Sequence, residues 1–207
     1  MRMLVHPWDR ARDDQEWQDW LAAGHDFGQL VAVDPDRRPI VQPTHFALDG
    51  DRVLLHLARP NPIWAALEHD PRCVLSVVDD YAYVPGPWRA EGATSPSAGV
   101  PTSHYAAVQL SGTAELIDDP ERKAALLREQ MAHFQPDGGT DPVRPEEGPF
   151  HRMLPGIRGV VLHVESVTAK FKYDAHKSAE LRESVASRLA ERGGRDAAAA
   201  EQVRNRG

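Results

Sequence analysis

The chain has 207 residues and a mass of 23.0 kDa, with 41% hydrophobic and 27% charged residues, which is typical of one globular domain. Its formal net charge is −7, and residues 79–150 hold twelve acids against five bases, which disfavours nucleic-acid binding through that region. A mean hydropathy of −0.50, the lack of an apolar leader or of an apolar run near ~18 residues, and a single cysteine exclude a membrane span and a disulfide scaffold and favour a cytoplasmic protein.

The first 80 residues predict one helix followed by short strands. Trp17, Trp20 and Leu21 repeat at helical spacing, so we expect a helix over residues 12–23. Asn61, followed by proline, is typical of a helix start and predicts a short helix that ends near residue 69. Alternating apolar residues predict four strands, over residues 27–33, 39–46, 52–58 and 72–79.

The rest of the chain combines long loops with long regular elements. Proline and glycine are frequent in residues 84–102 and 135–149, which predicts two long loops. The remaining patterns predict strands over residues 104–117 and 157–167 and helices over residues 119–134 and 179–192. We therefore expect a mainly β, α+β fold: a six-stranded antiparallel barrel or curled sheet with peripheral helices, as one domain over residues 1–192 followed by a flexible tail over residues 193–207.

The sequence carries no hydrolase, zinc, Walker or dinucleotide-binding motif, so it assigns no catalytic residue and predicts no metal site, and enzymatic activity stays open. Aromatic, amide and hydroxyl residues gather instead at strand–loop junctions, in residues 56–64 and 100–105. Such residues suit a flat aromatic ligand, and Arg59, Lys170 and Lys172 could bind a phosphate group on it. The alternative is that they are turn residues and rings that close the barrel.

These segments follow the order found in the PaiB family of bacterial FMN-binding proteins, often described as negative transcriptional regulators, and the chain resembles that family along most of its length. The most specific match is the segment from His56 to Trp64, which resembles the family's H-x-A-x-x-N-P-x-W motif. Weaker matches are Phe27-Gly28, Thr44-His45, Tyr81-Ala82-Tyr83, Pro87-Trp88, Pro101-Thr102, Tyr105, Met153-Leu154 and Lys172. The resemblance implies a split β-barrel like that of pyridoxamine phosphate oxidases, and a homodimer that holds FMN at its interface.

The chain also departs from the family pattern. Ser103 and His104 stand where the family has tryptophan and asparagine. After Lys172, the chain continues with tyrosine and Asp174 instead of the family's L-S-Q-N. A carboxylate close to an anionic phosphate is unfavourable unless it points away, so this departure bears on how tightly FMN would bind.

The resemblance implies a set of thirteen flavin contacts, in which Lys172 faces the phosphate and His56 and Asn61 position the ring edge and the loop backbone. The expected contacts are Thr44, His45, His56, Ala58, Asn61, Trp64, Trp88, Pro101, Thr102, His104, Tyr105, Lys170 and Lys172. Three functions are left open: a PaiB-type regulator with DNA or a regulatory partner, a flavin-dependent oxidoreductase of a small aromatic or quinonoid substrate, and a haem-binding protein with His104 or His176 as axial ligand.

Overall fold

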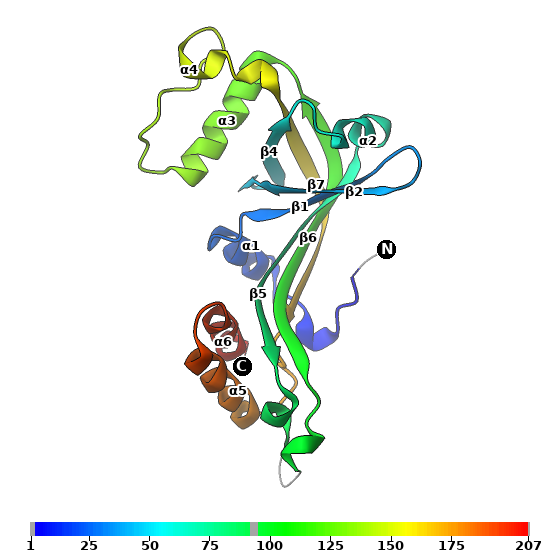
Figure 1. The fold of residues 1–207 in the computed structure, drawn as a ribbon, viewed down its shortest axis with the longest axis vertical. Coiled ribbons are helices and arrows are strands. Elements are labelled where there is room, and N and C mark those ends of the chain that lie inside the picture. Colours follow the sequence, from blue (N-terminus) through cyan, green and yellow to red (C-terminus); the bar gives the residue numbers. More distant parts are fainter. Residues whose placement is uncertain (1–2, 92–94, 207) are drawn as a thin grey trace. The chain divides into compact units, whose positions relative to one another are not determined.

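Seven strands form one sheet in this computed structural model, which describes residues 3–91 and 95–206 (Figure 1). The order across the sheet is β2-β1-β5-β6-β7-β4-β3, and the pairs β1–β2, β1–β5, β3–β4 and β4–β7 are antiparallel. The predicted antiparallel, α+β fold class is thereby confirmed. The strands are β1 (Phe27–Val33), β2 (Pro39–His45), β3 (Ala47–Asp49), β4 (Arg52–Ala58), β5 (Arg72–Val84), β6 (Thr102–Ile117) and β7 (Ile157–Lys172).

The prediction of six strands is wrong by one, and the described strands do not close into a barrel, because β2 and β3 lie at the two ends of the order. The additional strand is β3, whose residues were not assigned to either of the neighbouring strands predicted over residues 39–46 and 52–58. Gly50 adopts a φ of 60°, which allows a tight turn after Asp49. Ala47 then pairs with Leu54, so the residues after β2 form a hairpin with β4.

Two strands end later than predicted. β5 continues to Val84 and β7 to Lys172, beyond the residues where acids and polar residues indicated an end. Asp80 explains why β5 continues past residue 79. Its buried carboxylate accepts hydrogen bonds from Trp20 Nε1 at 2.7 Å and from Gln202 Nε2 at 3.0 Å. Because hydrogen bonds satisfy this carboxylate inside the protein, it does not need solvent, and the strand does not have to end there.

The helices begin where the sequence offers capping side chains. The side chains of Asp13, Asp119 and Ser178 each accept a hydrogen bond from a backbone N–H three residues on, at the starts of α1, α3 and α5. The predicted helices are confirmed there, with ends that differ by at most two residues. The helices are α1 (Asp14–Ala22), α2 (Ile63–His69), α3 (Pro120–Phe134), α4 (Gly148–His151), α5 (Ala179–Arg192) and α6 (Asp196–Asn205).

The expected flexible tail over residues 193–207 is replaced by α6 through Asn205. Gly193 ends α5 with a φ of 67°, a conformation that glycine adopts at little cost. Ala199, Ala200 and Val203 on α6 are then fully buried, and α6 packs against α5. The polar, alanine-rich sequence did not indicate this helix. Its small residues allow the close packing against α5.

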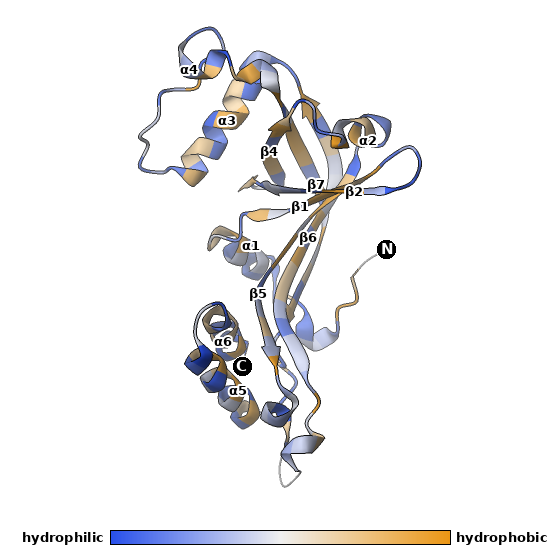
Figure 2. Ribbon diagram, viewed as in Figure 1, coloured by the Kyte–Doolittle hydropathy of each residue, from blue (hydrophilic) through white to orange (hydrophobic). Residues whose placement is uncertain are grey.

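The chain divides into two compact units, which are described separately. Unit 1 comprises Met1–Ala23, Val78–Val108 and Thr168–Gly207, and unit 2 comprises Gly24–Val77 and Gln109–Val167. Strands β5, β6 and β7 contribute residues to both, and Figure 2 shows the apolar residues along them. The largest fully buried side chains are Tyr173 and Phe171 in unit 1 and Phe46 in unit 2, where Leu30, Leu55, Leu75 and Leu162 are fully buried as well.

Cys73 belongs to the core of unit 2 and has an exposed fraction of 5%. Burial raises the pKa of its thiol to about 12. At pH 8 only about one molecule in 10⁴ then carries the reactive thiolate. We expect a thiol reagent to leave the native protein unmodified over hours and to modify it at once in 6 M guanidinium chloride. Rapid labelling of the native protein, followed by mass spectrometry, would contradict the burial of this side chain.

Candidate functional site

A pair of lysines on β7 forms the cationic centre of unit 1. Lys170 and Lys172 lie two residues apart, so their side chains share one face of the strand. Their Nζ atoms lie 5.5 and 5.8 Å from the ring centroid of Tyr105 on β6, within the range of a cation–π contact. Of the predicted phosphate-binding residues, these two are therefore brought together.

Lys172 is held in place by the neighbouring strand. Its Nζ donates to Thr102 Oγ1 at 2.7 Å and to the backbone oxygen of Ser103 at 2.9 Å. These bonds use two of the three ammonium protons, and they leave the hydroxyl proton of Thr102 free to donate. The pair can therefore present an N–H and an O–H to one anionic oxygen.

Burial shapes the electrostatics of this cluster. It lowers the pKa of Lys172, which the nearby carboxylate of Asp174 partly opposes. Burial also raises the pKa of Asp9, which the charge of Lys170 partly opposes. Lys170 itself donates to the backbone oxygen of Leu4 at 2.9 Å. The ammonium groups of Lys170 and Lys172 thus lie near the buried carboxylate of Asp9. Their positive charges would attract an added anion.

Asp174 is directed to a different cation. Arg89 Nε lies 2.9 Å from Asp174 Oδ2, and Arg89 Nη2 lies 3.0 Å from Oδ1, so the two side chains form a bidentate, buried pair. The guanidinium of Arg89 thus balances the charge of Asp174. Arg89 could not be identified as this partner from the sequence, because 85 positions separate it from Asp174.

His104 lies in the interior of unit 1, although it was expected to contact the cofactor. Its side chain has no exposed surface, its ring lies edge-on to Tyr173 at 5.7 Å, and its Nε2 lies 3.3 Å from Asp174 Oδ2. Neither ring nitrogen has a well-formed hydrogen bond to a described residue. In this arrangement its side chain cannot reach a ligand at the surface.

The other predicted residues of unit 1 lie apart from the lysines' contacts. Trp88 is covered by two arginines of α5, with Arg188 at 5.7 Å and Arg192 at 4.7 Å from its ring. Pro101 is exposed and forms none of these contacts. His176 is exposed and lies 4.9 Å from Trp8, an aromatic contact that the irregular N-terminal sequence did not indicate.

In unit 2, the turn after β4 is held by hydrogen bonds of its own side chains. Asn61 Oδ1 accepts from the backbone N–H of Ile63, its Nδ2 donates to Gln42 Oε1 at 2.8 Å, and Trp64 Nε1 donates to the oxygen of Ala58 at 3.0 Å. Trp64 is buried. The polar atoms of this motif thus support the turn, as the alternative interpretation of the sequence proposed, and Ala58 is exposed.

The two histidines among the predicted contacts of unit 2 are brought together. The rings of His45 and His56 lie 5.5 Å apart, and burial, followed by the charge of His56, lowers the pKa of His45. His56 Nδ1 lies 2.7 Å from Oε1 of the buried Gln130, a partner on α3 that the sequence did not identify. Thr44 is buried and donates to the backbone oxygen of His45 at 2.9 Å.

The thirteen predicted contacts therefore divide between the two units. Six of them lie in unit 2 and seven in unit 1. Within residues 3–91 and 95–206, no three His, Cys, Asp or Glu side chains are grouped so that they could hold a metal ion. No helix in the same residues is long and apolar enough to cross a membrane.

Comparison with known proteins adds a family and a fold. Residues 3–166 match the family described as "Putative FMN-binding domain". No curated protein matches the chain. Among solved structures, the flavocytochrome Anf3 from Azotobacter vinelandii is similar, with 23% identity, a TM-score of 0.63, and coverage of 83% of this chain and 72% of that chain.

Two further structures support the same fold. A FAD and heme binding protein from Mycobacterium smegmatis has 18% identity and a TM-score of 0.62, and the match covers 86% of this chain and 80% of that chain. The heme storage protein HutZ from Vibrio cholerae has 14% identity and a TM-score of 0.50, over 78% of this chain and 98% of that chain. At these identities the likenesses show the fold, a split-barrel-like antiparallel sheet with peripheral helices.

Proposed function

This chain belongs to the family of FMN-binding domains, and on that premise we propose that it is a flavoprotein that binds the phosphate of FMN at the Lys170–Lys172 pair. The observation that supports this proposal is the donor set in unit 1, in which Lys172 and Thr102 each keep a proton to donate. Tyr105 lies against both ammonium groups and holds them on one side of the strand. The lysines lie just beyond residues 3–166, which the family match covers.

The chemistry of the donor set fits the cofactor. A phosphate monoester is dianionic near neutral pH and accepts several hydrogen bonds. Lys170 adds a second positive charge. The carboxylate of Asp174 would repel a phosphate, but its charge is balanced by Arg89. When bound, FMN supplies electron or hydride transfer, whereas the protein supplies binding and orientation.

Removing the phosphate donors is expected to weaken FMN binding. Lys172→Met and Thr102→Val should each lower FMN affinity by about tenfold or more, because each removes a hydrogen bond to a charged group. Flavin fluorescence titration measures this effect. Riboflavin, which lacks the phosphate, should bind the wild type and both variants equally.

The control variant is Lys177→Met, whose ammonium lies 3.3 Å from Glu91 in an ion pair of its own. It should bind FMN as the wild type does. Equal losses for FMN and riboflavin would show that the Lys172 and Thr102 variants damage the fold, and unchanged FMN affinity would remove the lysine pair from the site.

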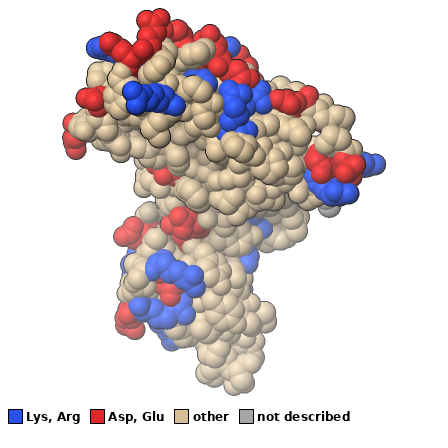
Figure 3. Space-filling view, turned by 45° about the horizontal axis from the view of Figure 1, so that its top comes forward, with Lys and Arg blue, Asp and Glu red and all other residues tan. Residues whose placement is uncertain are grey.

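For the reaction, we propose a flavin-dependent oxidoreductase of a small substrate, with a PaiB-type regulatory role as the second candidate. The H-x-A-x-x-N-P-x-W segment favours the second. On the face shown in Figure 3, lysines and arginines form separate groups interspersed with acids, which favours the first over direct DNA binding. Two measurements separate these functions. Reduction of the bound flavin by NADH or NADPH would support the oxidoreductase, and binding of promoter fragments in an anisotropy titration at low salt would support the regulator.

A homodimer is also proposed. Val78, Tyr81 and Tyr83 on β5 have exposed fractions of 61%, 37% and 48%, which is unusual for large apolar and aromatic side chains on a sheet. A second copy of the chain would cover them. Sedimentation equilibrium should give a mass near twice 23.0 kDa.

Haem is the alternative cofactor, and the exposed His176 is the residue that would reach it, since His104 has no exposed surface. A Soret band that is lost in His176→Ala would support haem.

A further inference from the structure

A cavity of about 580 Å³ lies in unit 2, and its lining residues include none of the residues of the proposed phosphate site. Leu127 and Met131, one helical turn apart on α3, form one wall, and Phe150 and Met153 form another. Its volume is in the range of small-molecule pockets, and most of its lining side chains are apolar. Its size and lining suit a small ligand with an apolar body.

The walls of the cavity are held in place by hydrogen bonds and apolar packing. Lys123 on α3 donates from Nζ to the backbone oxygens of Leu154 at 2.6 Å and of Ile157 at 3.3 Å. Ala124, Val143 and Leu154 form a buried cluster behind the cavity. The segment after α4 is therefore fixed against α3, and the cavity is preformed.

His56 supplies one polar group, and its hydrogen-bond network determines its tautomer. Gln130 Nε2 donates to the backbone oxygen of Leu54 at 3.0 Å, so its Oε1 must face His56 Nδ1 as an acceptor. Nδ1 therefore carries the proton in the neutral ring. Nε2 keeps its lone pair, and it makes no hydrogen bond to a described residue.

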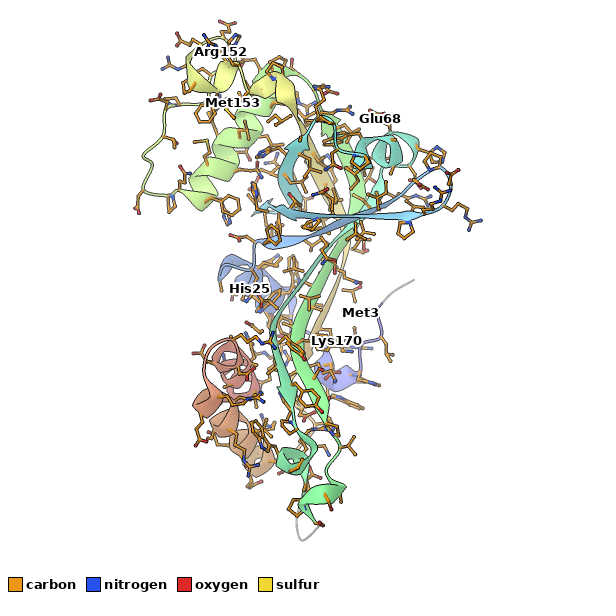
Figure 4. The ribbon with its side chains drawn as sticks, viewed as in Figure 1. Met3, His25, Glu68, Arg152, Met153 and Lys170 are labelled. Atoms are coloured by element: carbon orange, nitrogen blue, oxygen red, sulfur yellow. The ribbon has the colours of Figure 1, made fainter. Side chains whose placement is uncertain are left out.

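Arg152 supplies the second polar group. It lines the cavity, is exposed, and forms no hydrogen bond or ion pair with any described residue. Neighbouring arginines differ from it: Arg158 pairs with Asp118, and Arg144 pairs with Glu147. The lining contains no aspartate or glutamate. Figure 4 labels Arg152 and Met153 next to each other after α4.

We propose that this cavity binds a small aromatic carboxylate that carries a ring hydroxyl. The apolar walls would take the ring, Arg152 would bind the carboxylate, and His56 Nε2 would accept the hydrogen bond of the hydroxyl. This site is distinct from the proposed flavin phosphate site and does not depend on flavin binding.

Three matched probes test the proposal by isothermal titration calorimetry on the full chain. They are 6-hydroxy-2-naphthoate, 2-naphthoate, which lacks the hydroxyl, and 2-naphthol, which lacks the carboxylate. The wild type should bind the hydroxynaphthoate most tightly. Arg152→Gln should lower the affinity for both carboxylates by about tenfold and leave 2-naphthol unchanged.

His56→Phe should lower the affinity for 6-hydroxy-2-naphthoate and leave 2-naphthoate unchanged. Arg144→Gln on the same segment is the control and should match the wild type. Saturating FMN should not displace the probes. The proposal is overturned if the hydroxynaphthoate does not bind at millimolar concentration, if Arg152→Gln binds it as tightly as the wild type, or if FMN competes for the cavity.

Discussion

Replacing Arg89 by alanine is expected to lower the free energy of unfolding by about 3–5 kcal/mol, because it leaves the buried carboxylate of Asp174 without its partner. The side chains have exposed fractions of 13% and 8%, so water can replace little of the lost interaction. Arg89 also donates to the backbone oxygen of Val100, so it links the residues that follow β5 to the residues that precede β6. Urea denaturation of the variant measures the effect.

The chain offers a matched control for this variant. Arg72 forms two hydrogen bonds to Asp70 in the same bidentate geometry, but the side chain of Arg72 is 80% exposed. Arg72→Ala should therefore change the unfolding midpoint little. Replacing both members of the buried pair, as in Arg89→Met with Asp174→Leu, should recover most of the loss. A midpoint for Arg89→Ala equal to that for Arg72→Ala would contradict the burial argument.

The same pair determines a pH dependence. Burial alone would raise the pKa of Asp174, but the contacts with His104 and Arg89 outweigh it and hold the pKa below its ordinary range. A lowered pKa stabilises the folded state at a pH above the ordinary carboxyl value near 4. That stabilisation is lost as the pH falls from there toward the pKa of the folded state. Arg89→Ala should remove part of this acid sensitivity.

Local patterns predicted the elements well where a local cause forms them. Asp119 is followed by a proline that suits the first turn of a helix, and the start of α3 could be predicted from these two residues alone. β3 and α6 were missed because their formation depends on pairing or packing with a neighbouring element rather than on a pattern within the element itself. Ala47 pairs with Leu54, and the alanines of α6 are buried only because α5 packs beside them.

The candidate site shows the same division. Lys172 and Thr102 were predicted from the family resemblance, and the structure brings them to 2.7 Å. The same resemblance placed His104 at the cofactor, although its side chain is fully buried. Gln130, which orients His56, lies 74 positions away from it. A single sequence contains no signal for such a pairing, because neither periodicity nor spacing connects the two residues.

The second large effect is expected at Gly112, in the part of β6 that belongs to unit 2. A Cβ atom added there would lie 1.8 Å from the backbone oxygen of His163 and 2.9 Å from its carbonyl carbon on β7. A glycine inside a strand often marks such a close approach of two backbones. Because the clash is with backbone rather than with a flexible side chain, Gly112→Ala must push the two strands apart.

Gly112→Ala should therefore cost more than the ~1–3 kcal/mol of ordinary overpacking in a core, as measured by urea denaturation. Gly156→Ala is the control, since a Cβ there would meet nothing within 4 Å, and it should stay within about 0.5 kcal/mol of the wild type. The two variants add the same methyl group within unit 2, so a difference between them reports the space available and not the residue type. Equal unfolding midpoints would mean that β6 and β7 do not approach each other as closely at Gly112 as the structure has them.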